Sequence, residues 1–78
     1  MYISYGGNKM AISYNKLWKL LIDRGMTKTE MRKEAGISTN ILAKMGRNET
    51  VSMETLGKIT TVLHCGLDDI VDITEVGE

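Results

Sequence analysis

Residues 27–48, TKTEMRKEAGISTNILAKMGRN, form the stretch of sequence that decides the fold. Thr27 stands three residues before Glu30, which is the spacing of a capping box, in which each side chain bonds to a backbone amide at the start of a helix. Gly36 marks the end of the same helix, because glycine readily adopts the left-handed conformation with which many helices stop. The pattern therefore predicts a short helix over residues 28–35.

A second helix follows this one almost immediately. Ser38 is a preferred N-cap residue and Asn48 tolerates the positive φ that ends a helix, so we expect a helix over residues 38–47. Two short helices joined by a tight turn that contains glycine are typical of a helix-turn-helix. The side chains expected to face inward and to hold the two helices at a steep angle are Met31, Ala35, Ile37, Leu42 and Met45.

The second helix of the pair has an outer face of short, polar and basic side chains. A helix that lies in the major groove of DNA needs such a face, because its side chains must approach the base edges and the phosphates. We therefore predict that the chain binds double-stranded DNA and places the helix over residues 38–47 in the major groove. The outward residues are Thr39, Asn40, Ala43, Lys44 and Arg47.

Helical patterns flank this motif on both sides. Leucines spaced three and four residues apart predict a helix over residues 14–24. Ser52 is the expected N-cap of a longer helix that Gly66 closes, and Asp68 is the expected cap of a short fifth helix over residues 67–71.

These elements predict an all-α, compact five-helix DNA-binding domain over residues 13–71, with the helix-turn-helix at about 27–48. Residues 1–12 form an N-terminal arm that is either flexible or strand-like. The C-terminal tail, residues 72–78, alternates apolar and polar residues loosely, and either pairs as a short edge strand or frays.

The composition excludes several other classes of protein. The chain has 78 residues, 42% of them hydrophobic and 26% charged, which is typical of one small globular domain. One cysteine and one histidine are too few for an internal disulfide or a zinc site, and no catalytic motif is present, so we expect no enzyme, metal, cofactor or small-molecule effector. No stretch has the pattern of a membrane span or a secretory signal, and the expected location is cytoplasmic.

The charge is unevenly distributed, although the chain is neutral overall. Residues 1–50 carry nine Lys or Arg and four acidic residues, a net charge of +5, and residues 51–78 carry −5. This asymmetry indicates one surface for a polyanion and another for a different role.

The ordered set of features resembles the Cro/C1-type (XRE) helix-turn-helix family of phage and bacterial transcriptional regulators. The resemblance covers residues 14–71 and includes the capped helix with its glutamate and the Leu63 to Ile70 closing element. It implies a Cro/C1 repressor-like fold. The other residues that carry it are Thr27, Glu30, Met31, Gly36, Ile37, Ser38, Leu42, Ser52 and Leu56.

The resemblance also implies which residues contact DNA. Base edges are read by Thr39, Asn40 and Lys44, where asparagine suits adenine and lysine suits guanine. The remaining family positions contact the DNA backbone and position the domain. They are Lys28, Ser38, Arg47, Asn48 and Ser52.

Three positions depart from the usual family pattern. Arg32 stands where a small alanine lets the two helices approach, and Lys28 stands where glutamine is common. Gly46 replaces a glutamate inside the recognition helix, at a cost of about 1 kcal/mol relative to alanine. These changes affect the detail of base reading more than the fold.

One recognition helix contacts few base pairs, so we expect a homodimer that binds two half-sites about 34 Å apart. The apolar residues left over near the C-terminus are the candidates for the dimer contact. The alternative function is a helical protein-interaction module or an antitoxin-like partner without direct DNA readout, which the neutral net charge leaves open. The candidate dimer residues are Ile70, Val71, Ile73 and Val76.

Overall fold

The computed structural model describes residues 9–76, and it describes side-chain surroundings for residues 11–73. Residues 1–8 of the expected arm and 77–78 of the expected tail lie outside this range. Four α-helices, a single 3-10 turn and two strands make up the described part of the chain. Their order is β1 (Lys9–Ser13), α1 (Asn15–Asp23), α2 (Lys28–Ala35), α3 (Thr39–Gly46), α4 (Met53–Leu63), η1 (Leu67–Asp69) and β2 (Asp72–Val76).

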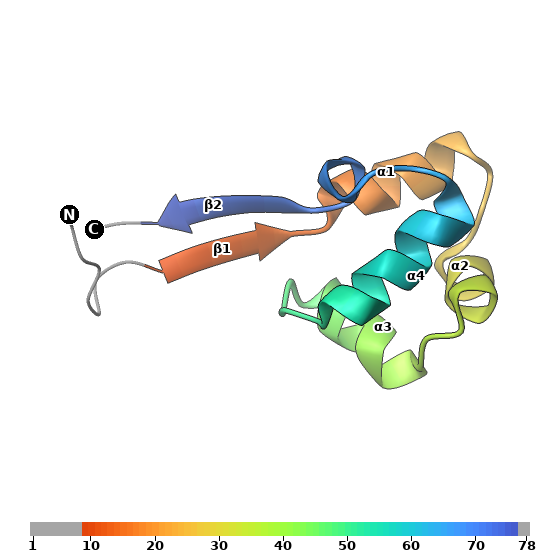
Figure 1. Ribbon diagram of the computed structural model, residues 1–78, viewed down its shortest axis with the longest axis horizontal. Coiled ribbons are helices and arrows are strands. Elements are labelled where there is room, and N and C mark those ends of the chain that lie inside the picture. The colour runs from red at the N-terminus through yellow and green to blue at the C-terminus, as the bar shows by residue number, and fades with distance from the viewer. Residues whose placement is uncertain (1–8, 77–78) are drawn as a thin grey trace.

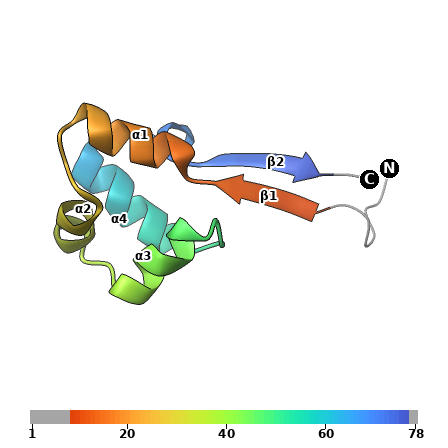
Figure 2. The same cartoon turned by 180° about the vertical axis from the view of Figure 1, so that it is seen from behind.

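The two ends of the described chain form an antiparallel strand pair, β1 with β2, which we call the ribbon. Figures 1 and 2 show the ribbon projecting from one side of the helical body. Ile12 pairs with Ile73 in its register. The all-α expectation is therefore incomplete, and the strand alternative for the arm and the tail is confirmed for residues 9–12 and 72–76.

The expected fifth helix over residues 67–71 is instead one 3-10 turn, so the five-helix count is wrong for the described residues. Asp69, rather than Asp68, closes this turn, because its carboxylate accepts a hydrogen bond from the Gly66 amide at 2.9 Å. Ile70 is the C-cap of this turn, and both Ile70 and Val71 are buried in the core. The chain therefore leaves the turn directly into β2.

The hydrophobic core lies among the four helices and is closed by the segment before β2. Of the residues expected to face inward from α2 and α3, all are buried except Leu42, which is half-buried at the edge. Each fully buried side chain of this size contributes roughly 1.5–3 kcal/mol relative to leaving it exposed. The buried residues are Tyr14, Leu17, Leu21, Met31, Ala35, Ile37, Met45, Leu56, Ile59, Leu63, Ile70 and Val71. Among the described helices, none is long and apolar enough to cross a membrane.

Each of the four α-helices ends with a residue of positive φ, followed by an amide that bonds back five residues into the helix. This is the 6→1 bond of the Schellman motif, which satisfies a carbonyl at the helix end. The residues of positive φ are Gly25, Gly36, Asn48 and His64. Gly66, expected to close α4, has φ −93° and instead begins η1.

His64 occupies its left-handed position at φ +55°, a conformation that a side chain with a Cβ adopts at a cost. We predict that His64→Gly raises the free energy of unfolding by about 0.5–1 kcal/mol, measured by urea denaturation. His64→Ala retains the Cβ and should give no such gain. Equal stabilisation by both variants would show that backbone strain is not the cause.

Candidate nucleic-acid interface

The capping box at the start of α2 forms as expected. The Thr27 Oγ1 accepts a hydrogen bond from the Glu30 amide at 3.0 Å, and the Thr27 amide donates to Glu30 Oε1 at 2.8 Å. At the other end of α2, Gly36 has φ +71°, and the Ile37 amide donates to the Arg32 carbonyl oxygen at 3.1 Å. These local bonds fix where α2 begins and where the chain turns toward α3.

Arg32 holds the same turn from the other direction. Its Nη1 donates to the carbonyl oxygen of Ile37 at 3.2 Å, and its side chain is half-buried. A small residue at this position cannot make that bond. The arginine that departs from the family pattern therefore bridges the turn between α2 and α3, a role that the sequence did not indicate.

The outer face of α3 is exposed. Ser38 caps the helix, with its Oγ accepting from the Ile41 amide at 3.1 Å, while Met45 is fully buried on the opposite side. Because these inward contacts anchor the helix, its polar side faces solvent. The exposed residues are Thr39, Asn40, Ala43, Lys44 and Arg47, all of those expected on the outer face.

An ion pair lies at the end of this face. The Arg47 Nε donates to Glu49 Oε2 at 2.7 Å, and both side chains are exposed. The hydrogen bond from Arg47 lowers the pKa of the Glu49 carboxyl, and the charge of Lys44 lowers it further. Glu49 thus brings a negative charge close to Arg47 and Lys44, a contact that no sequence motif indicates.

Lys28, at the start of α2, lies over an aromatic ring. Its Nζ is 4.2 Å from the centre of the Trp18 ring, a cation–π contact, and Trp18 is half-buried on α1. The contact ties the first turn of α2 to α1. Lys28 is exposed, so its ammonium group remains accessible to solvent.

Tyr14 connects the end of the interface to the base of the ribbon. Its Oη donates to the carbonyl oxygen of Glu49 at 2.6 Å, and its amide donates to Asn48 Oδ1 at 3.4 Å. The ring is buried, and burial raises the pKa of the Tyr14 phenol. Asn48, at φ +58°, therefore uses its side-chain oxygen within the protein, at the loop that follows α3.

Ser52 serves mainly as the cap of α4. Its Oγ accepts from the Thr55 amide at 3.1 Å and lies 3.0 Å from Thr55 Oγ1. The amides of the two preceding positions in the first turn have no partner within the helix. Because the Ser52 hydroxyl is engaged with Thr55, the backbone amides are the main hydrogen-bond donors that the start of α4 presents to a ligand.

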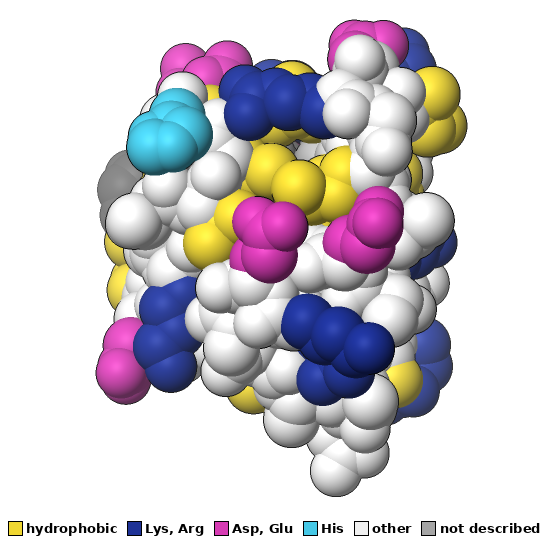
Figure 3. Space-filling view, turned by 90° about the vertical axis from the view of Figure 1, so that its right-hand side faces the viewer, with side chains coloured by type: hydrophobic (Ala, Val, Ile, Leu, Met, Phe, Trp, Pro, Cys, Tyr) yellow, Lys and Arg dark blue, Asp and Glu magenta, His cyan; other side chains and the backbone are white. Residues whose placement is uncertain are grey.

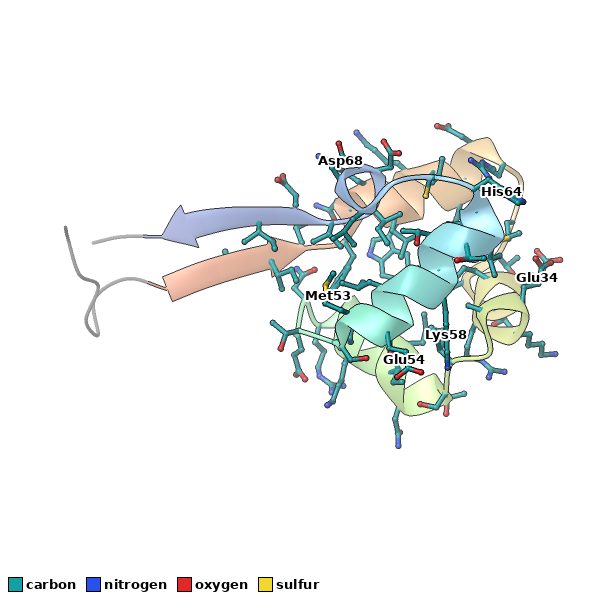
Figure 4. The ribbon with its side chains drawn as sticks, viewed as in Figure 1. Glu34, Met53, Glu54, Lys58, His64 and Asp68 are labelled. Atoms are coloured by element: carbon teal, nitrogen blue, oxygen red, sulfur yellow. The ribbon has the colours of Figure 1, made fainter. Side chains whose placement is uncertain are left out.

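A groove of about 540 Å³ between α2 and α4 is the main alternative surface on the helical body. Figure 4 places Glu34 on α2, and Glu54 and Lys58 on α4, while Figure 3 shows apolar side chains in a hollow between charged ones on the face opposite the ribbon. Within residues 9–76 there is no group of three His, Cys, Asp or Glu that could hold a metal ion. The described side chains that line the groove carry charges of both signs and form no cluster typical of a catalytic or metal site.

The two capped helices, the glycine turn and the exposed face of α3 define a helix-turn-helix DNA-binding domain. Residues 16–75 match the family model of the Cro/C1-type HTH DNA-binding domain, and the chain belongs to this family. The crystal structure of the transcriptional regulator VanUg is similar to the chain, with 44% sequence identity and a TM-score of 0.82. The alignment covers 100% of this chain and 99% of that one. A comparison with curated proteins finds no match.

We predict that Tyr14→Phe lowers the free energy of unfolding by about 1 kcal/mol, because the carbonyl of Glu49 loses its bond in a partly buried place. Thr61→Val is the control, since it removes an exposed hydroxyl bond to Gly57 within one helix and should cost less than half as much. Urea denaturation measures both. An unchanged stability in Tyr14→Phe would contradict the structural role of this junction.

Proposed function

We propose that the chain is a sequence-specific regulator of transcription that binds double-stranded DNA with α3 in the major groove and has no enzymatic activity. The observation that carries this proposal is the exposed polar and basic face of α3 in a Cro/C1-type domain. The similarity to the transcriptional regulator VanUg over the full chain supports the regulatory role.

Three exposed side chains of α3 read the bases. Asn40 lies in the first turn and Lys44 lies four residues further, so these two project from the same side of the helix, and Thr39 is exposed beside them at its start. The Asn40 amide is suited to a bidentate pair with adenine, and the Lys44 ammonium to the acceptors of guanine. Discrimination between sequences resides in these contacts.

The remaining contacts are to the DNA backbone. Arg47 and Asn48 end α3, while Lys28, Ser38 and Ser52 lie at the starts of three helices, where positive dipole ends and free amides favour phosphate. Ser38 and Ser52 accept bonds from their own helices, so at these positions the backbone amides supply much of the attraction. These contacts fix the orientation of α3 without reading sequence.

The protein acts as a homodimer, because a single recognition helix contacts too few base pairs for useful specificity. The two helices then read half-sites about 34 Å apart, one turn of the duplex. Selection of bound sequences from random duplex DNA at about 150 mM salt tests the function, its symmetry and the half-site spacing together. A palindromic consensus is the expected result, and recovery of no consensus would contradict sequence-specific binding.

We predict that Asn40→Ala weakens binding to the selected site by about 1–3 kcal/mol and hardly affects binding to random DNA. The control is Asn15→Ala, an exposed asparagine at the start of α1, which should leave both affinities unchanged. Fluorescence anisotropy at fixed salt measures both. An unchanged affinity of Asn40→Ala for the selected site would show that the base-reading assignment is wrong.

We predict that Glu49→Gln strengthens binding to selected and random DNA by a similar factor of a few-fold. The substitution releases Arg47 from its ion pair and removes a negative charge that phosphates would otherwise approach. Glu34→Gln makes the same charge change on α2 and should have a smaller effect. Weaker binding by Glu49→Gln would show that the ion pair positions Arg47 rather than competing for it.

Salt dependence distinguishes DNA binding from the alternative of a protein-interaction module. Each phosphate contact makes log K fall with log salt by a slope of about −0.9, and Lys28→Ala should reduce the total slope by about one. The Lys28→Ala variant should weaken binding to the selected site and to random DNA about equally. An interaction module would show no saturable binding to any duplex.

A further inference from the structure

Trp18 is the single tryptophan of the chain and lies on α1. Its amide donates to the Tyr14 carbonyl oxygen at 3.1 Å, and the centres of the two rings are 6.4 Å apart, with their planes tilted by 54°. Aromatic pairs favour a tilted arrangement at this separation. Because Tyr14 is fully buried and Trp18 packs against the core, the indole ring has a fixed support within the protein.

The same ring holds a cation at the surface. The Lys28 Nζ lies 4.2 Å from the centre of the Trp18 ring. The face of an aromatic ring is partly negative, and tryptophan attracts an ammonium group more strongly than the other aromatic side chains do. Trp18 is half-buried whereas Lys28 is exposed, so the ring covers one side of the ammonium group and the other side faces solvent.

The surroundings of Lys28 favour an anion on that open side. Lys28 is the first residue of α2, where the positive end of the helix dipole disfavours a cation. The amides of Lys28 and Thr29 precede the first bond within the helix, which Met31 donates, so they have no partner in it. The acid of this turn, Glu30, accepts a bond from the N-cap amide. The ring of Trp18 is therefore the group that holds the Lys28 ammonium.

An aromatic ring orients a cation without neutralising it. Arg47, at the end of α3, is held by the carboxylate of Glu49, which cancels part of its charge. Lys28 is held by a neutral side chain and keeps its full charge for a phosphate. A free lysine side chain loses conformational entropy when it binds, and a side chain that is already oriented loses less. The contact with Trp18 therefore favours phosphate binding by Lys28.

We propose that Trp18 is a positioning residue for DNA binding, because its ring holds the Lys28 ammonium at the start of α2 in place for a phosphate of the duplex. Ring, ammonium and phosphate then form a stack, and Trp18 itself does not touch the DNA. This role rests on the proposed function, since it acts through the phosphate contact of Lys28. The contact between ring and ammonium is a property of the free protein.

Fluorinated tryptophans test this role without a change of shape. Because the chain contains one tryptophan, an auxotrophic host supplied with them alters Trp18 alone. Fluorine withdraws electron density from the ring and weakens its attraction for a cation. Affinity of the full chain for duplex DNA should fall stepwise with single and triple fluorination, by roughly two- to tenfold in all. Selected and random duplexes should respond alike, since a phosphate contact reads no sequence.

The matched control is Lys28→Gln, which carries the same tryptophans and lacks the ammonium group. Its affinity should not depend on fluorination. A constant affinity across the series in the wild-type chain would overturn the proposal. An equal fall in Lys28→Gln would overturn it too, because the ring would then act on DNA binding without Lys28.

Substitutions give an independent test. Trp18→Leu should weaken binding by a factor similar to full fluorination, and Trp18→Phe by less, because phenylalanine keeps a ring. Lys28→Arg should retain most of the affinity, since a guanidinium group also stacks on an indole. In the Lys28→Gln background, Trp18→Leu should cause no further loss. Additive losses would overturn the positioning role, and so would tighter binding by Trp18→Leu, which would show that the ring competes with phosphate.

Nuclear magnetic resonance of the free chain separates this proposal from the proposed function. The ring current of Trp18 should shift the Hε protons of Lys28 upfield of those of Lys58, an exposed lysine on α4. A chain that binds DNA with an unshifted Lys28 would overturn the positioning by Trp18 alone. A chain that shows the shift but binds no duplex would contradict the proposed function, and with it the role of Trp18 in DNA binding.

Discussion

The turn from α2 into α3 is the constraint on which the rest of the structure depends. Gly36 takes the positive φ that reverses the chain, and Ile37 follows it into the core, where it is 4% exposed. The turn is thus held by backbone bonds, by the burial of Ile37 and by the bond from Arg32. Because both ends of α3 are anchored, its polar face cannot rotate inward without burying groups that need water.

Tyr14 makes a second connection that local sequence patterns do not show. It packs in the core, begins α1, directly follows β1 and bonds to the loop after α3. Tyr14 therefore links the base of the ribbon to the loop that follows α3.

Basic and acidic residues occupy different parts of the described chain. Basic residues occur on α2 and α3, while acidic residues follow α4 and continue along η1 into β2. Glu49 moderates the basic face, since it pairs with Arg47 beside the end of α3. This ion pair reduces the positive charge that the face presents to solvent.

The sequence by itself determined the starts of α2, α3 and α4, the glycine turn, and which residues of α3 face outward, because capping bonds and helical periodicity act within a few residues. Only the tertiary structure decided that residues 9–13 pair with 72–76 and that the expected fifth helix is one turn. It also decided that Arg32 bridges the turn and that Ile70 and Val71 belong to the core rather than to a dimer contact. Strand partners, and core positions shared by several elements, depend on residues that are distant in the chain, and a local pattern contains no information about which distant segment will cover it.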